Sequence, residues 1–260
     1  MRTKSTFLGI ILFLGLTGFT PAQGPAQVGY GVLTPDMRNA TPMASVVYGN
    51  GQGNELKETS VQAAVLSTQA VLYITVEAAD DKNTGIALVN PDLRAANVSF
   101  TLSNAVGEVW STPQVFTLNG YHQLSRFITE FFPDRIPANF SGSLTISSDQ
   151  PLAILGLRIR GNSLSSIPLA DLSATRYPVP VRDGVVGGPN AIIFPIMVFG
   201  GGFETSFLIL NTAPNAIYGR IDLFQADGTP LTTRLNNQTG NSFNYVIPSR
   251  GVMALEDRAR

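Results

Sequence analysis

The chain has 260 residues, of which 44% are apolar and only 13% are charged. Its 17 Lys and Arg residues nearly balance its 18 Asp and Glu residues, which excludes the strongly basic surface of a typical nucleic-acid-binding protein. The chain has no Cys and one His, His122, so disulfides, zinc–thiolate sites, thiolate catalysis and sites with two imidazoles are excluded.

Residues 1–22 have the pattern of a secretory signal peptide. Arg2 and Lys4 precede an apolar run at 7–19, and small residues at 20 and 22 fit a cleavage site before Gln23. The run is shorter than the ~20 residues that a membrane span needs, and an uncleaved anchor is the alternative. We expect a secreted or extracytoplasmic protein, located at the cell surface, with no membrane span after cleavage.

Beyond residue 28 the apolar residues recur with a period of two. In 97–103, Val98, Phe100 and Leu102 alternate with polar residues, and 140–147 repeats this alternation. Such a pattern predicts antiparallel strands with one buried face and one wet face. Turn residues are expected to separate the strands at Asn90-Pro91-Asp92, Asn119-Gly120, Asp149-Gln150-Pro151 and Asp227-Gly228.

A helical pattern is limited to one short stretch, 125–132. Ser125 is the expected cap of this helix, and Pro133 ends it. The sequence therefore predicts an all-β protein.

The strands come in copies. Residues 72–110 align without a gap with 193–231, at an offset of 121. Inward positions Phe100 and Leu102 fall on Ile221 and Leu223, so the buried face is kept. Besides Leu102/Leu223, the identical pairs are Thr84/Thr205, Asn90/Asn211, Ala95/Ala216, Ala105/Ala226 and Gly107/Gly228.

A weaker similarity links the beginning of the chain to its middle. Residues 42–48 resemble 151–157, and each stretch leads into a loop with Gly and Asn and then another apolar strand. Both stretches are therefore interpreted as closing strands of a module.

Five segments follow from these alignments. The chain begins with the signal peptide (1–22) and the closing strands of a module (23–69), which are followed by a complete β-sandwich module (70–172). A linker rich in Pro and Gly (173–190) then leads to a second, incomplete module (191–260). An incomplete module would expose a sheet face or edge, which favours aggregation. One hypothesis is that 23–69 packs with 191–260 to complete it, and the other is that the open halves meet another copy.

A known family shares these motifs. The stretch 83–91, Asn-Thr-Gly-Ile-Ala-Leu-Val-Asn-Pro, and the stretch 142–153 are similar to tandem β-sandwich (Ig-like) repeat modules of large uncharacterised secreted bacterial proteins. In the second copy, 200–206 leads into 208–211 in the same way. The resemblance implies two antiparallel β-sandwich (Ig-like) modules in tandem, and it brings no catalytic residue to transfer.

The densest group of side-chain oxygens is the one candidate metal site. Asp80, Asp81, Asn83 and Asp92 offer oxygens of the kind that Ca²⁺ prefers. Their spacing does not match the twelve-residue calcium loop, and Gly201 and Gly202 replace the first two in the second copy. A solvated turn is the simpler interpretation.

Candidate binding residues are aromatic and cationic. Trp110, Tyr121, Arg158 and Arg160 could stack on a sugar or bind an acidic partner. Protection of an edge strand by inserted charge explains the two arginines equally well.

Catalytic groups are sparse. His122 has no evident nucleophile partner, and Glu130 and Asp134 flank Arg135 on one exposed turn, which favours a surface charge cluster. Gly200-Gly201-Gly202 lacks the Lys that a phosphate-binding loop requires.

We therefore expect a secreted, non-enzymatic repeat protein with a structural, spacer or adhesion role and no cofactor. Its expected partner is a surface glycan or another cell-surface protein. The alternative is a carbohydrate-binding module that uses aromatic and Asn or Gln side chains.

Overall fold

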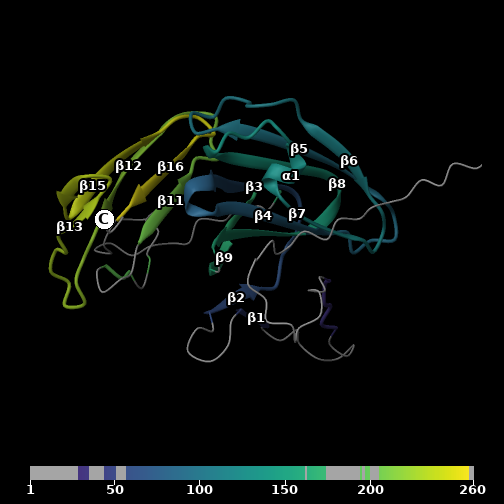
Figure 1. Ribbon diagram of the computed structural model, residues 1–260, viewed down its shortest axis with the longest axis horizontal. Helices are drawn as coiled ribbons and strands as arrows, with labels where there is room; N and C mark the ends of the chain where they lie inside the picture. Colours follow the sequence, from purple (N-terminus) through teal and green to yellow (C-terminus); the bar gives the residue numbers. More distant parts are fainter. Residues whose placement is uncertain are drawn as a thin grey trace, which may run out of the picture.

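Strand β8 (Asn139–Arg160), which is 22 residues long, organises the main sheet of the protein. Figure 1 shows the computed structural model, which describes residues 29–34, 44–50, 57–161, 163–173, 194, 197–199 and 205–257. The protein is all-β, as predicted, and its pairings between strands are antiparallel. The elements of the main sheet are β3 (Leu66–Glu77), η2 (Ala78–Asp80), β4 (Lys82–Val89), β5 (Ala96–Asn104), β6 (Gln114–Leu118), β7 (Gln123–Phe127), α1 (Ile128–Phe131), β8, β9 (Ser163–Ile167) and β10 (Leu169–Asp171).

The main sheet curls around β8 into a half-barrel. The first half of β8 pairs with β3 and β5, and the second half pairs with β4 and β9. The other edges are β6 on β5, β7 on β4 and β10 on β3. One strand thus belongs to both walls of the half-barrel, and side chains from both walls meet on the inner face.

The predicted turn at 149–151 is wrong, because β8 runs through these residues without a break. The register of β8 against β3 shifts there, from Gln69↔Ser147 to Ser67↔Leu152. Pro151 lacks an N–H, and a bulge is one of the few places in a sheet that tolerates proline. Residues 149–151 thus bend β8, so that the strand passes from one wall of the half-barrel to the other. The predicted turns at 90–92, 119–120 and 227–228 do lie between strands.

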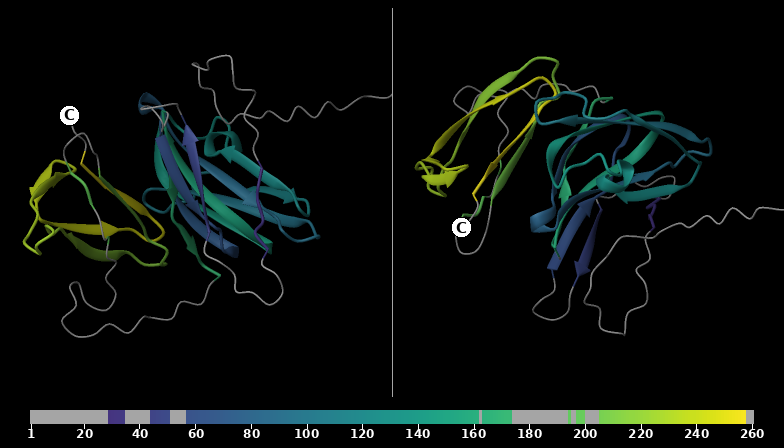
Figure 2. Two further views of the ribbon diagram at one scale, coloured as in Figure 1. Left: turned by 90° about the horizontal axis from the view of Figure 1, so that it is seen from below. Right: turned by 45° about the horizontal axis from the view of Figure 1, so that its top comes forward.

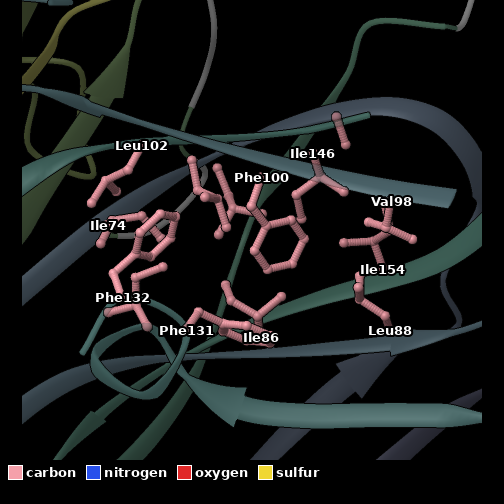
Figure 3. Packing of buried hydrophobic residues seen from close by; sticks show 14 of the residues in the cluster. Ile74, Ile86, Leu88, Val98, Phe100, Leu102, Phe131, Phe132, Ile146 and Ile154 are labelled. Atoms are coloured by element: carbon pink, nitrogen blue, oxygen red, sulfur yellow. The ribbon is translucent and has the colours of Figure 1, made fainter. Parts of the chain in front are cut away.

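The core lies on the inner face of the half-barrel (Figure 3). The predicted inward residues Val98, Phe100 and Leu102 are fully buried, which confirms the alternation in β5. The ring of Phe100 packs edge to face with Phe116 and Phe131, at centroid distances of 5.2 and 4.8 Å. Burying each large side chain contributes about 1.5–3 kcal/mol, so this face holds the sheet closed.

Helix α1 covers one end of this core, but its predicted cap is wrong. Ser125 lies within β7, and the helix begins at Ile128. Glu130 supplies the capping contact, since its Oε2 accepts a hydrogen bond from the Phe127 N–H at 2.7 Å. Ser125 is kept in the strand because β7 pairs along its whole length with β4.

The C-terminal part, residues 205–257, is drawn in light green to yellow in Figure 2. Its strand pairing repeats that of the half-barrel. Its strands are β11 (Ser206–Leu210), β12 (Ile217–Asp222), β13 (Thr233–Leu235), β14 (Gln238–Gly240), β15 (Ser242–Ile247) and β16 (Val252–Glu256). The pair β11–β16 has the register of β4–β7, and β12–β15 has the register of β5–β6. The offset is 121 residues for the first strand of each pair and 129 for the second.

A buried asparagine holds the same turn in both parts. The side-chain amide of Asn90 donates to the carbonyl oxygens of residues 94, 118 and 119, and its Oδ1 accepts from the N–H of residue 92. Asn211 makes the four equivalent bonds, to residues 215, 247, 248 and 213. Gly107 and Gly228, at φ of +86° and +83°, also occupy equivalent turns.

The half-barrel and the C-terminal part pack against each other through a small boundary, which contains both apolar contacts and hydrogen bonds. Tyr73 of β3, Ile167 of β9 and Val252 of β16 form a buried apolar cluster, to which Leu208 and Leu210 add. The Val252 N–H donates to the Ala105 carbonyl at 3.0 Å, and the Ser143 hydroxyl donates to the Arg250 carbonyl at 3.4 Å. Ser143 was predicted on a wet face, and the C-terminal part buries it.

Strands β1 (Ser45–Asn50) and β2 (Lys57–Gln62) form a separate hairpin. Lys57 Nζ donates to the Ser163 hydroxyl at 3.4 Å, which places β2 beside β9. The expected packing of 23–69 with 191–260 stays a prediction, as do the domain boundaries. Residues 1–28, 174–190 and 200–204 lie outside the described residues, and so do the expected signal peptide, most of the linker and the glycine run.

Candidate functional site at the boundary between the two parts

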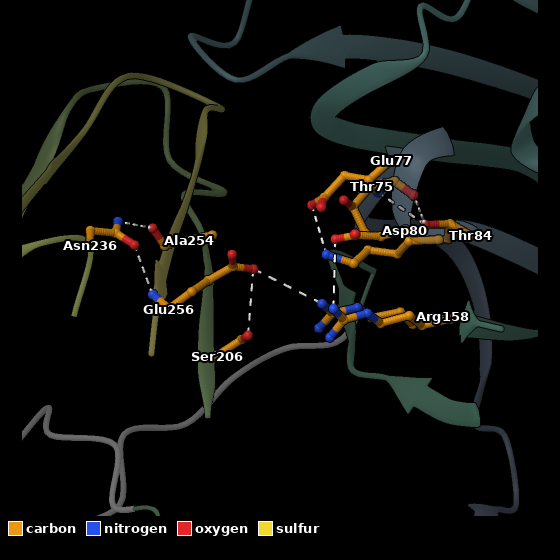
Figure 4. Close-up of polar contacts among 11 residues, drawn as sticks. Thr75, Glu77, Asp80, Thr84, Arg158, Ser206, Asn236, Ala254 and Glu256 are labelled. Atoms are coloured by element: carbon orange, nitrogen blue, oxygen red, sulfur yellow. Dashed lines mark hydrogen bonds and ion pairs between the residues drawn. The ribbon is translucent and has the colours of Figure 1, made fainter. Parts of the chain in front are cut away.

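Charged side chains gather where β3, β4 and β8 meet the C-terminal part (Figure 4). Lys82 begins β4, and its Nζ lies 2.7 Å from Glu77 Oε1 at the end of β3. Only 2% of the Lys82 side chain and 19% of the Glu77 side chain are exposed. Removing one partner of such a buried pair leaves the other charge uncompensated, which is strongly destabilising.

A threonine bridge lies next to this ion pair. The Thr84 hydroxyl donates to the Thr75 carbonyl at 2.9 Å and accepts from the Thr75 N–H at 3.0 Å. The bridge replaces ladder bonds between β3 and β4 at a point where the strands diverge, since their direct pairing is limited to Glu77↔Lys82. It therefore fixes the spacing of the two strands that carry the buried ion pair.

Two arginines extend the charged group towards the C-terminal part. Arg160 lies 3.7 Å from Asp80, and Arg158 lies 4.0 Å from Glu256 of β16. The Ser206 hydroxyl of β11 also contacts Glu256, at 3.5 Å. The explanation of these arginines as edge-strand protection is wrong, because β8 pairs at this point with β4 on one side and β9 on the other.

The Tyr73 ring lies in the apolar part of the same boundary. Burial raises the pKa of its hydroxyl, and a hydrogen bond with Ser141 lowers it to a smaller extent. The nearby carboxylate of Glu256 adds to the rise. The phenol is therefore held in its neutral form, as a packing group with one polar contact.

The four candidate metal residues do not meet at one point. Asp80 faces Arg160, and the Asn83 amide donates to the Thr129 hydroxyl. Asp92 contacts Arg94 at the other end of β4. An eight-residue strand is roughly 23 Å long, so one ion cannot contact both ends. Among the described residues, no group of three or more Asp, Glu or His side chains is placed to hold a metal ion.

The candidate binding residues have different surroundings. The Trp110 indole N–H donates to the Arg135 carbonyl at 2.7 Å, and its ring packs on Phe140 at 5.6 Å. Tyr121 is exposed in the turn before β7, and its carbonyl accepts from the Tyr30 hydroxyl. Trp110 and Tyr121 thus lie in different loops, whereas Arg158 and Arg160 lie at the boundary between the half-barrel and the C-terminal part.

The sparse catalytic candidates have structural contacts. His122 Nδ1 lies 2.7 Å from the Gly120 carbonyl in the turn before β7. Glu130 caps α1, as described above, and Asp134 has a φ of +58° in the turn after that helix. His122 and Asp134 thus lie in turns, and Glu130 serves as a helix cap.

Sequence reasoning missed the buried Lys82–Glu77 pair and the role of the two asparagines. A lysine at a strand start gives no sign of burial in the sequence. Asn90 and Asn211 carried a usable signal, because they are identical in the two aligned copies and each follows an apolar strand. Asparagine in that place is typical of turns in which the side chain replaces backbone hydrogen-bond partners.

No protein-family model and no curated protein matches the chain. Among solved structures, the Anabaena sensory rhodopsin transducer is similar, with a TM-score of 0.31 and 16% sequence identity. The match covers 36% of this chain and 89% of that protein.

No helix within the described ranges combines the length and the apolar character that a bilayer crossing requires.

Proposed function

We propose that the protein is a secreted, non-enzymatic structural element, a spacer or adhesion module at the cell surface. One observation supports this proposal above the others: the same strand register occurs twice in the chain. Repetition of one structural unit is typical of proteins that extend or present a surface. The finer assignment of both parts as β-sandwich (Ig-like) modules belongs to the same proposal.

The boundary between the parts supports a spacer role in particular. The backbone hydrogen bond from Val252 to Ala105, the bond from the Ser143 hydroxyl to Arg250, an apolar cluster and the Arg158–Glu256 pair act together there. A boundary of this kind fixes an angle between two units, whereas a bare linker would not. Of the three ion pairs near the boundary, Arg158–Glu256 joins the two parts, whereas Lys82–Glu77 and Arg160–Asp80 lie within the half-barrel.

The location outside the cytoplasm rests on residues 1–22, whose basic start and apolar run have the signal-peptide pattern. An extracellular site also fits the composition, which is low in charge and rich in polar uncharged residues.

Spin-label distances test the spacer role, and the absence of cysteine makes the labelling specific. Val115→Cys in β6 and Tyr218→Cys in β12 place labels on exposed positions of the two parts. We expect one narrow distance distribution. The pair Val115→Cys and Leu93→Cys, which lies within the half-barrel, gives the reference width. A distribution several times wider than this reference contradicts the spacer role.

Carbohydrate binding is the second candidate, and the exposure of Tyr121 favours it. A glycan array with the wild-type chain and the Tyr121→Ala variant distinguishes the two roles. Binding to a defined glycan that the variant loses would favour the carbohydrate-binding role. Equal binding by both proteins, or none, argues against Tyr121 as a sugar platform. Surface glycans and cell-surface proteins remain the proposed partners.

A further inference from the structure

The boundary between the half-barrel and the C-terminal part contains one turn from each. The half-barrel contributes the β5–β6 turn, residues 104–107, and the C-terminal part contributes the β15–β16 turn, residues 248–251. Gly107 lies so close to the Ser249 carbonyl that a Cβ would not fit, and the Val252 N–H donates to the Ala105 carbonyl at 3.0 Å. One turn thus docks directly on the other.

The C-terminal part has its own copy of the β5–β6 turn. This is the β12–β13 turn, residues 225–228, at the offset of 121. The Gly228 N–H donates to the Gln225 carbonyl at 3.0 Å, and the Gly107 N–H donates to the Asn104 carbonyl at the same distance. The backbone of the docking turn is therefore present twice in the chain.

The half-barrel likewise has its own copy of the β15–β16 turn. This is the β6–β7 turn, residues 119–122, at the offset of 129. Tyr121 and Arg250 occupy the same place, with φ of +58° and +55°. Their N–H groups donate to the carbonyls of Asp92 and Ala213, at 3.2 Å in both parts. The backbone of the receiving turn is therefore also present twice.

The second copy of the docking turn is open. Residues 224–230 are all exposed, and nothing lies within 4 Å of the place that a Cβ of Gly228 would take. Phe224 is 42% exposed, whereas its equivalent Ser103, next to the docked turn, is 7% exposed. A large apolar ring in an exposed turn is typical of an interaction surface when a second such surface lies ready to receive it.

The second copy of the receiving turn is open as well. Tyr121 is 58% exposed, and His122 is also exposed, whereas Gly251, the equivalent of His122, is buried at the boundary. The chain thus uses one docking turn and one receiving turn internally and exposes the other turn of each kind.

The N-terminal segment lies beside the open receiving turn. The Tyr30 hydroxyl donates to the Tyr121 carbonyl at 3.1 Å, just as the Ser143 hydroxyl donates to the Arg250 carbonyl at the boundary. Gly29 accepts a hydrogen bond from the side-chain amide of Gln123. Tyr30 therefore takes the place of Ser143. No described residue takes the place of Ala105 at this turn.

We propose that the β12–β13 turn of one copy of this chain docks on the β6–β7 turn of a second copy, in the way that the β5–β6 turn docks on the β15–β16 turn within the chain. The offsets place Gly228 against the Gly120 carbonyl, and the Ala226 carbonyl opposite the Gln123 N–H. The two surfaces differ, so the copies join head to tail in open chains. This assembly goes beyond the proposed spacer role and does not depend on it.

A second copy is required because the two open turns do not meet in the chain that carries them. Strand β12, which leads into the open docking turn, lies at one end of the molecule, and β6 and β7, which flank the open receiving turn, lie at the opposite end (Figure 1). The boundary between them holds the parts in place. A second copy brings the counterpart that the chain itself already uses once, whereas an unrelated protein has no such counterpart in this structure.

The proposed contact is weaker than the internal boundary. Val252 is buried in the apolar cluster at the boundary, whereas its equivalent in the half-barrel is the polar residue Gln123. His122 corresponds to Gly251, where a Cβ would lie 2.6 Å from the Ala105 carbonyl. The His122 side chain therefore holds the incoming turn slightly away, and its removal should strengthen the contact.

Engineered disulfides test this docking, since the chain has no cysteine of its own. The double variant Ala226→Cys/Gln123→Cys places one thiol at each open turn. A disulfide needs Cα atoms within about 7 Å, and two residues joined by a backbone hydrogen bond meet this condition. Ala105→Cys/Val252→Cys has the same geometry within one chain and is the positive reference, which should give cross-linked monomers.

The negative control is Ala226→Cys/Val115→Cys, which moves one thiol to an exposed valine of β6. We expect Ala226→Cys/Gln123→Cys to form covalent dimers and longer chains on mild oxidation, roughly tenfold faster than this control. Adding His122→Gly should raise the rate severalfold. Adding Gly228→Ala should lower it severalfold, because the equivalent Gly107 leaves no room for a Cβ.

Four results would overturn the proposal. The first is cross-linked monomers of Ala226→Cys/Gln123→Cys in place of dimers, and the second is a rate equal to that of the negative control. The third is a rate that His122→Gly and Gly228→Ala leave unchanged. The fourth is a cross-link that forms only when Tyr30→Ala is added, because the N-terminal segment would then be the occupant of the receiving turn.

Discussion

Replacing Gly107 by alanine should uncouple the two parts, and Gly228 provides a matched control. Both glycines lie in equivalent turns with almost the same positive φ, so alanine costs each turn about 1–2 kcal/mol of backbone strain. At Gly107 the new methyl group would also collide with the backbone carbonyl of Ser249, whereas at Gly228 nothing lies within 4 Å. The difference between the two variants therefore isolates the packing between the parts.

The size of this difference follows from the contacts near Ser249. Moving its carbonyl displaces the turn that carries the Val252–Ala105 and Ser143–Arg250 hydrogen bonds, each worth about 1 kcal/mol. Partial exposure of Val252 adds about 1 kcal/mol more. We expect Gly107→Ala to lower the free energy of unfolding by about 2–3 kcal/mol more than Gly228→Ala does.

Urea denaturation followed by far-ultraviolet circular dichroism measures both variants. The spin-label distribution between the two parts should broaden in Gly107→Ala and stay narrow in Gly228→Ala. Free energies of unfolding that agree within about 0.5 kcal/mol, with equally narrow distributions, would refute the boundary described here.

Three further predictions concern single side chains. Asn90→Ala removes four hydrogen bonds in a buried turn, so urea denaturation should show a free energy of unfolding lower by about 3 kcal/mol. The control Asn244→Ala, at an exposed position, should change this free energy by less than about 0.5 kcal/mol. The raised pKa of Tyr73 means that the folded state keeps the phenol proton more tightly than the unfolded state. Its contribution is complete below pH 10 and is lost as the pH rises above that value, so Tyr73→Phe should show a smaller loss of stability between pH 9 and 12. Hydrogen bonds from Asn97 hold the pKa of Asp149 below its ordinary 3.8. This carboxylate therefore stabilises the fold above pH 3.8 and ceases to do so as the pH falls further. In an acid titration, the free energy of unfolding of Asp149→Asn should fall less steeply than that of the wild-type chain. An unchanged slope in either titration, or equal stability of the two asparagine variants, would contradict the corresponding prediction.

The strand faces could be predicted from the sequence because burial follows a simple period. Val98, Phe100 and Leu102 lie where the alternation put them, and the turns at Asn90 and Asn119 end the strands as expected. The path of β8 through residues 149–151 could not be predicted in this way. Asp, Gln and Pro are suitable residues both for a turn that reverses the chain and for a bend within one strand. Which of the two forms depends on pairing with β3, β4 and β5, which lie far away in the sequence.

The boundary was hidden from the sequence for a similar reason. Ser143 and Tyr73 lie buried at this boundary: the Ser143 hydroxyl donates to the Arg250 carbonyl, and Tyr73 packs with Ile167 and Val252. Lys82 likewise becomes buried because Glu77, five residues away, faces it across a tight connection. Such contacts depend on tertiary structure and leave no periodic pattern.

Strand register in the C-terminal part tests the central claim most directly. Nuclear Overhauser effects between backbone protons of the labelled chain measure it without any substitution. The claim that both parts share one arrangement predicts cross-strand signals for Leu208 with Ala254 and for Gly219 with Tyr245. It also predicts the equivalent signals for Ala87 with Ser125 and for Val98 with Phe116. Signals displaced by one residue in the C-terminal part alone, or strands 206–210 and 252–256 that do not pair, would contradict it.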